Sequence, residues 1–212
     1  MPITRRSTGP SQDMVTNILR PSETISLTGM RFSGKTEVGK ALSERLGIPL
    51  HDTDTIFRQQ YGTTVQNYVK SAGWRGFRAA ECGVILDLFS QIRENAIVSL
   101  GGGALVNSDS IYHRNLNLQA VKDKGMVVYL LPSPDLKLSA AILGERERMN
   151  GEDNNRPKLP PLETLVERHP LYLAACDNFV VYEAELGKAD KSEMIDRKAG
   201  EIIRRISELR RK

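Results

Sequence analysis

Cysteine and long apolar runs are scarce in this sequence. Its two cysteines, Cys82 and Cys176, are too few for a disulfide framework and lack the spacing of metal ligands. The longest strand-like apolar run, residues 126–131, is far shorter than the roughly 18 residues that a membrane-spanning helix needs. Residues 1–20 interrupt their apolar residues with arginine, aspartate and proline, so we expect no secretory signal there. These absences argue against secreted, membrane-inserted and zinc-finger proteins, and they predict a reduced, cytoplasmic protein.

The remaining composition is that of one globular domain. Apolar residues make up 40% and charged residues 26% of the 212 residues, a balance that allows a single buried core. Thirty Lys and Arg against 26 Asp and Glu give a net charge of +4, which suits small polyanions as well as nucleic acid. The basic residues near the C-terminus have no aromatic residues among them, so we predict no nucleic-acid partner. We also expect no membrane partner and a monomer.

Strand-like and helix-like segments alternate after a polar tail. We expect a loose tail over residues 1–23 and a single domain over residues 24–212. Short β-prone runs lie at residues 24–28, 48–50, 96–100, 126–131 and 178–182. Helical patterns lie at residues 35–46, 55–61, 74–92, 108–124, 134–143 and 162–176, and in a C-terminal amphipathic segment. This alternation predicts an α/β fold of three layers, a parallel sheet with helices on both faces.

Residues 144–161 differ in composition from the rest of the domain. They contain charged residues, three Asn and three Pro, and almost nothing that a core would bury. Such a segment is typical of a mobile loop. We therefore expect Arg146 and Lys158 to be solvated loop charges.

A phosphate-binding motif lies between the first predicted strand and helix. Residues 29–36, GMRFSGKT, match the pattern G-x-x-x-x-G-K-[ST]. Gly34 lets the backbone close around phosphates, Lys35 reaches the β- and γ-oxygens, and the Thr36 hydroxyl is a ligand for Mg²⁺. The predicted ATP site includes Phe32, Ser33, Gly34, Lys35, Thr36 and Glu37.

Signatures of other phosphate-loop proteins are missing from the sequence. There is no Asn-Lys-x-Asp for guanine, and Thr36 stands where adenylate kinases have a glycine. The apolar strands end at Gly101 and Pro132, whereas motor ATPases have an aspartate for Mg²⁺ at such a strand end. An acidic residue from elsewhere must therefore complete the site.

Asp52 and Asp54 are the candidates for that acidic residue. They follow the second predicted strand, and the carboxyl ends of parallel strands line such sites. If the strand continues, both carboxylates point the same way, one toward a metal's water shell and the other toward a substrate hydroxyl. The alternative is that Asp54 caps a helix while Asp52 is solvated.

The motifs occur in an order that resembles the shikimate kinase family over about residues 24–176. Beyond the phosphate loop they are Asp52-x-Asp54, GWRGFRAAE at 73–81, GGG at 101–103, Arg156-Pro157, and RHPLY at 168–172. The phosphate loop and Gly73-Trp74 are similar to the kinase module of fungal multifunctional aromatic-pathway enzymes. The resemblance implies a nucleoside-monophosphate-kinase-like fold with a mobile lid. It also implies transfer of the ATP γ-phosphoryl group, with Mg²⁺, to the 3-hydroxyl of shikimate, giving shikimate 3-phosphate in aromatic amino acid (chorismate) biosynthesis.

The resemblance also implies roles for individual residues. Catalysis is expected from Asp54, which would orient the attacking hydroxyl and accept its proton, and from Lys35 and Arg156. Asp52 and Thr36 would hold Mg²⁺, and residues 144–161 would form the lid, with Arg148 as a weaker candidate for adenine. The expected shikimate ligands are Asp54, Arg78, Gly101, Gly102, Gly103 and Arg168.

Physical arguments support the two arginines as carboxylate ligands. A guanidinium is planar and always charged, which suits a carboxylate, and Glu81 lies three residues after Arg78 on the same predicted helix, where it can orient that guanidinium.

Phe32 departs from the family pattern, which commonly has a third glycine there. A related kinase acting on another polyol acid such as gluconate would not explain Arg78, Arg168 and the glycine turn together. A catalytically silent nucleotide-binding regulator is disfavoured because Lys35, Asp54 and Arg78 are all present.

Overall fold

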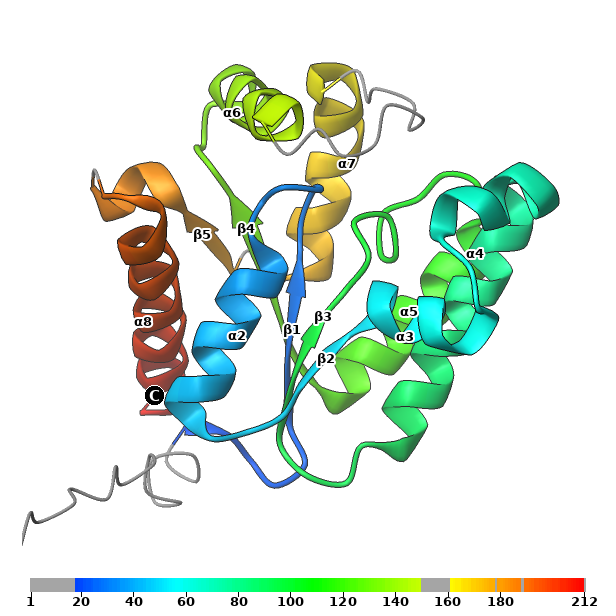
Figure 1. Cartoon of the computed structure of the whole chain (residues 1–212). Coiled ribbons are helices and arrows are strands. Elements are labelled where there is room, and N and C mark those ends of the chain that lie inside the picture. The colour runs from blue at the N-terminus through cyan, green and yellow to red at the C-terminus, as the bar shows by residue number, and fades with distance from the viewer. Residues whose placement is uncertain (1–17, 150–160, 178, 188, 212) are drawn as a thin grey trace, which may run out of the picture.

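Five parallel strands form one sheet in the order β2-β3-β1-β4-β5 (Figure 1). This architecture comes from a computed structural model, which describes residues 18–149, 161–177, 179–187 and 189–211. The strands are β1 (Thr24–Thr28), β2 (Leu50–Asp52), β3 (Ala96–Ser99), β4 (Gly125–Leu131) and β5 (Val180–Tyr182). The predicted α/β fold with a parallel sheet is confirmed.

Helices cover both faces of this sheet. They are α2 (Lys35–Leu46), α3 (Thr53–Tyr61), α4 (Val65–Gln91), α5 (Ile111–Lys124), α6 (Leu136–Met149), α7 (Pro161–Ala175) and α8 (Lys191–Arg210), with a short 3₁₀ helix η1 (Glu183–Leu186). Helices α2 and α8 pack on one face, and α4 to α7 supply the apolar side chains on the other. Within the described residues, no helix has both the length and the apolar character needed to cross a bilayer.

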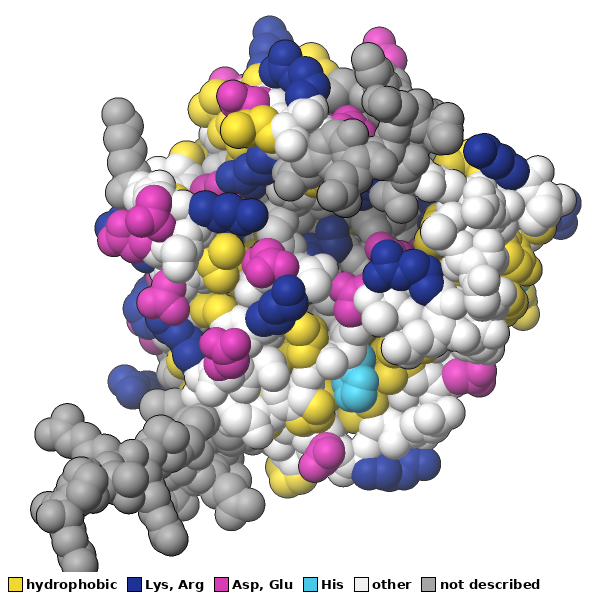
Figure 2. Space-filling view, in the orientation of Figure 1, with side chains coloured by type: hydrophobic (Ala, Val, Ile, Leu, Met, Phe, Trp, Pro, Cys, Tyr) yellow, Lys and Arg dark blue, Asp and Glu magenta, His cyan; other side chains and the backbone are white. Residues whose placement is uncertain are grey.

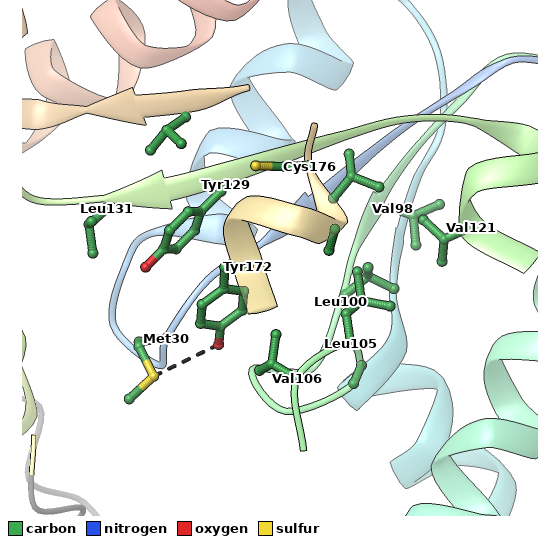
Figure 3. Close-up of a cluster of buried hydrophobic side chains, with 14 of the residues drawn as sticks. Met30, Val98, Leu100, Leu105, Val106, Val121, Tyr129, Leu131, Tyr172 and Cys176 are labelled. Atoms are coloured by element: carbon green, nitrogen blue, oxygen red, sulfur yellow. Dashed lines mark hydrogen bonds between the residues drawn. The ribbon is translucent and has the colours of Figure 1, made fainter. Parts of the chain in front are cut away.

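Strand β4 contributes to two separate cores. Val128 and Leu130 pack in the cluster with α2 and α8, whereas Val127 and Tyr129 belong to the cluster with α4 to α7. In the second cluster the ring of Tyr129 stacks on Tyr172 of α7, with ring centroids 4.5 Å apart (Figure 3). Burial on both faces agrees with the uninterrupted apolar sequence of this strand, as expected for the interior of a parallel sheet.

Three boundaries differ from the expectation. Helix α6 continues to Met149, so residues 144–149 are helical and not part of a loop, because the run Glu-Arg-Glu-Arg-Met consists of good helix formers. Helix α4 begins at Val65 and kinks at Gly73, whose φ of 69° requires a glycine-like conformation, so the expected helix is only its second half. Ile18 and Leu19, assigned to the loose tail, are buried against α2 and α8.

The carboxyl ends of three strands meet at one edge of the sheet. The phosphate loop follows β1, Asp52 ends β2, and Leu100 and the glycine turn follow β3. Strand β3 pairs in parallel with both β1 and β2. The sequence motifs that follow these three strands therefore lie together at the same edge of the sheet.

Candidate active site

The phosphate loop forms one wall of a cavity of about 240 Å³. Figure 2 shows the hollow on this face, with basic and acidic side chains at its walls. Gly34 (φ 90°) begins helix α2 and has no side chain to cap its free N–H groups, so the positive end of the helix stays open to a ligand. Of the predicted nucleotide-site residues, five line the cavity and Ser33 is fully buried behind it. The five are Phe32, Gly34, Lys35, Thr36 and Glu37.

Lys35 places its ammonium group inside the loop. Its Nζ donates hydrogen bonds to the carbonyl oxygens of Gly29 at 3.0 Å and Met30 at 2.9 Å. Burial lowers the pKa of Lys35 to about 8, although the carboxylates of Asp54 and Asp52 oppose the shift. The side chain is therefore mostly protonated at neutral pH and provides a partly desolvated cation, which attracts phosphate more strongly than a solvated one.

The carboxylate of Asp52 binds two groups: the hydroxyl of Thr36, which is a candidate Mg²⁺ ligand, and a backbone N–H in the first turn of α3. Its Oδ2 accepts a hydrogen bond from Thr36 Oγ1 at 2.8 Å, and its Oδ1 accepts one from the Thr55 N–H at 3.0 Å, which caps α3. The alternative from sequence, a cap at Asp54 with Asp52 solvated, is wrong because Asp52 itself caps the helix and is hydrogen-bonded to Thr36. The strand also ends at Asp52, so Asp54 lies in the first turn of α3 and not two residues further along an extended strand.

Asp54 nevertheless lines the same cavity as Lys35 and Asp52. It also lies against the glycine turn, because a Cβ on Gly101 would be 3.2 Å from Asp54 Oδ1 and 2.7 Å from Glu81 Oε1. Only a residue without a side chain fits between these two carboxylates without displacing one of them. Asp54 is therefore at the junction between the phosphate loop and the glycine turn.

Arg78 is buried and held on several sides. Its Nη1 donates to Glu81 Oε2 at 2.7 Å, which confirms the predicted pairing, and its Nε donates to Asp109 Oδ2 at 3.3 Å. The guanidinium carbon lies 5.2 Å from the centroid of the Trp74 ring. A Cβ on Gly103 would be 2.5 Å from Nη2, so the turn glycine makes room for the guanidinium. These contacts fix the plane of Arg78 before any ligand binds.

Arg168 approaches the same region from α7. The pKa of Tyr172 is raised by burial, and this shift is opposed by Arg168, which donates a hydrogen bond to the hydroxyl, and by Arg78. Burial also raises the pKa of Glu81, again opposed by Arg78 and by Arg168. Both guanidinium charges act on Tyr172 and Glu81, so Arg78 and Arg168, 90 positions apart in the sequence, lie in the same region. That both bind one carboxylate stays a prediction.

Tyr172 connects the two loops of the site. Its hydroxyl donates to the Gly102 carbonyl oxygen and lies 3.8 Å from the sulfur of Met30 in the phosphate loop (Figure 3). Tyr172 belongs to the RHPLY motif, but the sequence indicated no role for it. Asp109 had no signal at all, since it reaches Arg78 from a segment 31 residues away.

The predictions for residues 144–161 have different outcomes. Arg156 and Lys158 lie outside the described residues. Arg148 lies exposed in the last turn of α6 and is not among the residues that line the cavity. The expectation that Arg146 is a solvated loop charge is wrong, because its guanidinium pairs with Glu183 through two hydrogen bonds.

Comparison with known proteins identifies the family. The family model for shikimate kinase matches residues 31–206. The chain belongs to the shikimate kinase family. Shikimate kinase 2 of Yersinia enterocolitica is 34% identical over 158 residues, which make up 71% of this chain and 82% of that protein.

Solved shikimate kinases share the fold. The enzyme from Acinetobacter baumannii, in complex with shikimate, matches with a TM-score of 0.70 and 25% identity over 94% of this chain and 99% of that one. Shikimate kinase from Bacteroides thetaiotaomicron matches with a TM-score of 0.65 and 25% identity over 88% of this chain and 97% of that one. The phosphate loop on this parallel sheet is thus the α/β fold of shikimate kinases.

Proposed function

We propose that this kinase transfers the γ-phosphoryl group of ATP to the 3-hydroxyl of shikimate. The observation that carries the proposal is the position of Asp54, between the phosphate loop and a turn against which Arg78 packs. A phosphoryl donor and an anionic hydroxylated ring can occupy the two sides of this carboxylate. The family membership and the Acinetobacter structure with shikimate support the identity of the ring.

The phosphate loop and its lysine would bind the triphosphate. The open N-terminus of α2 and the cation of Lys35 favour the negative charge that develops on the transferred group. Lys35 would exchange its two carbonyl partners for phosphate oxygens, which are better acceptors for an ammonium group.

The residues beside the loop fit a magnesium ion. Thr36 and Asp52 offer a hydroxyl and a carboxylate oxygen in the same cavity, with Ser99 Oγ 3.4 Å from the threonine hydroxyl. Mg²⁺ prefers such oxygen ligands and usually takes one or two from protein while phosphates and water supply the rest. When bound, the ion would neutralise part of the charge on the β- and γ-phosphates.

Asp54 would orient the attacking hydroxyl and accept its proton. In a loose phosphoryl-transfer transition state the nucleophile needs alignment more than strong activation, so a carboxylate held in one place suffices. The first turn of α3, started by the Asp52 cap, supplies that rigidity.

Arg78 and Arg168 would bind the carboxylate of shikimate. Glu81 and Asp109 already hold Arg78, so a ligand pays little entropy to align it. Gly101, Gly102 and Gly103 would let the backbone approach the ring. Arg156 in the lid would approach the transferred phosphoryl group, and Arg148 remains the candidate for adenine on the family resemblance alone.

A substrate panel tests the proposal. Purified protein with ATP and Mg²⁺ is assayed for ADP release with shikimate, quinate and gluconate, each against an ATP-only blank. We expect release that depends on shikimate. Release with gluconate alone would identify a different polyol-acid kinase, and ATP binding without release for any acceptor would identify a silent regulator. Either result would overturn the proposal.

A further inference from the structure

A cluster of three charged residues, two of them buried, lies directly behind the phosphate loop. It consists of Arg146 from α6, Glu183 from η1 and Lys198 from α8. The two oxygens of Glu183 accept hydrogen bonds from Arg146 Nη1 at 2.9 Å and Nη2 at 2.6 Å, and Lys198 Nζ also donates to Oε1. Lys198 is only 3% and Glu183 only 8% exposed, so this ion pair is buried, whereas the Arg146 side chain is 34% exposed.

Both cations of the cluster also hold the backbone of the phosphate loop. Arg146 Nη1 donates to the Phe32 carbonyl oxygen at 3.2 Å, and Lys198 Nζ donates to the Ser33 carbonyl oxygen at 3.2 Å. A Cβ on Gly34 would lie 3.5 Å from Lys198 Nζ, so the ammonium is in contact distance of the loop itself. Two helices distant from the loop in the sequence, α6 and α8, thus hold two consecutive peptide groups.

Holding these carbonyls sets the direction of the loop's donors. In a trans peptide the C=O and the following N–H point in opposite directions. With the Ser33 carbonyl directed at Lys198, the Gly34 N–H is turned away from the cluster, and Gly34 itself lines the cavity. The loop also needs support, because Phe32 has a φ of 63°, a left-handed conformation that a side chain disfavours.

The charge of the cluster is suited to the same role. Two cations share one carboxylate, so a surplus positive charge lies behind a loop that faces polyphosphate. The pKa of Glu183 is lowered although burial opposes this, since Arg146 and Lys198 both donate to it, so the carboxylate is ionised. Buried ion pairs contribute little to stability compared with apolar residues of similar volume, which leaves positioning of the loop as the better explanation.

We propose that Arg146, Glu183 and Lys198 are positioning residues that hold the phosphate loop in its polyphosphate-binding conformation. The proposal rests on the proposed function only in that the loop binds the phosphates of ATP. None of the three needs to touch the transferred group.

The test compares two single variants with an exposed control. Lys198→Met and Arg146→Met each remove one cation and leave a neutral buried pair, and Arg204→Met removes an exposed ion-paired arginine from α8. Binding of ATP and of inorganic tripolyphosphate, both with Mg²⁺, is measured by calorimetry, and shikimate binding is followed by the fluorescence of the single tryptophan, Trp74.

We expect Kd for both ATP and tripolyphosphate to rise about tenfold in each cluster variant, as for loss of a hydrogen bond from a charged donor. The KM for ATP should rise by a similar factor. The kcat at saturating ATP and the Kd for shikimate should stay within about twofold of wild type. The Arg204→Met variant should match wild type. Unchanged tripolyphosphate affinity in either cluster variant overturns the proposal. This includes the case in which only the affinity for ATP falls, because that result would indicate a lost contact to the adenine base.

A triple variant separates positioning from stability. Arg146→Met with Glu183→Leu and Lys198→Met replaces the cluster by apolar side chains and should restore the unfolding midpoint while phosphate affinity stays low. Recovery of both would overturn the proposal. Failure of the proposed function has a different signature: the wild type would bind tripolyphosphate, the cluster variants would bind it weakly, and no shikimate would be phosphorylated.

Discussion

At the scale of single residues, the site depends on groups whose surroundings were set by distant parts of the chain. Lys35, Thr36 and Asp52 line one cavity, as the sequence indicated. The phosphate-loop motif positions the first two, and the parallel neighbouring strand ends bring Asp52 beside them. The sequence left open whether Asp52 or Asp54 caps the helix, because either residue satisfies the local preference for a helix cap and only the end of β2 decides between them. Asp109 and Glu183 act through contacts that no local pattern encodes.

The carboxylate of Asp54 provides the first prediction. Asp54→Asn keeps the shape of the side chain but removes its charge and its capacity to accept a proton. We expect kcat to fall at least about a hundredfold, as for loss of a general base, with the Kd for shikimate changed much less. Steady-state kinetics and tryptophan fluorescence measure the two quantities. A kcat near that of wild type would remove Asp54 from the proposed role.

The ammonium of Lys35 provides a prediction on pH. Burial lowers its pKa to about 8 in the free protein, and bound phosphate favours the protonated form, which raises the pKa in the complex. Binding then requires uptake of a proton above pH 8, so Kd for ATP should be flat from pH 7.5 to about 8 and rise by up to about tenfold per pH unit beyond it. In Lys35→Arg, which stays charged, this rise should vanish. The same rise in that variant would assign the titration to another group.

At the scale of elements, the predicted strands were recovered, but several ends were wrong. Residues 144–149 continue α6 because Glu, Arg and Met favour helix, although the Asn and Pro residues that follow them are typical of a loop. The extension matters for function, because it carries Arg146 onto the helix that reaches the phosphate loop. The glycines after β3 were predicted to let the backbone approach a substrate ring. The structure adds a second reason for glycine there, because neighbouring side chains occupy the space that a Cβ would need.

That space can be tested at Gly103. A Cβ in Gly103→Ala would be 2.5 Å from Arg78 Nη2 and must displace the guanidinium. We expect the KM for shikimate to rise at least about tenfold, by analogy with loss of a charged hydrogen-bond partner, while Kd for ATP stays near wild type. Gly83→Ala is the control, because a Cβ there meets nothing within 4 Å and lies on α4, where alanine stabilises the helix. An equal loss of affinity for shikimate and for ATP would mean that the turn affects the whole site and does not act through Arg78.

At the scale of the whole molecule, the sheet separates two cores with different neighbours. The cluster with α4 to α7 includes Met30 and Tyr172, so it reaches both loops of the site. The cluster with α2 and α8 lies on the other face and includes Ile18 and Leu19, which precede β1. Composition around these two residues indicated a tail, and their burial could not be predicted because it depends on apolar side chains that only the folded chain brings together.

Substitution in that second cluster should therefore affect stability without affecting chemistry. Leu19 is 3% exposed, and Leu19→Ala should lower the free energy of unfolding by about 2 kcal/mol, the lower end for a buried leucine near the edge of a core. Leu209→Ala on α8, where the leucine is 57% exposed, should cost less than about 0.5 kcal/mol. Urea unfolding gives both values, and kcat and both KM values should stay near wild type well below the unfolding midpoint. A loss of kcat in folded Leu19→Ala would show that the two cores are coupled through the sheet, most directly through α2, whose first turn carries Lys35 and Thr36 and whose later turns pack in this cluster.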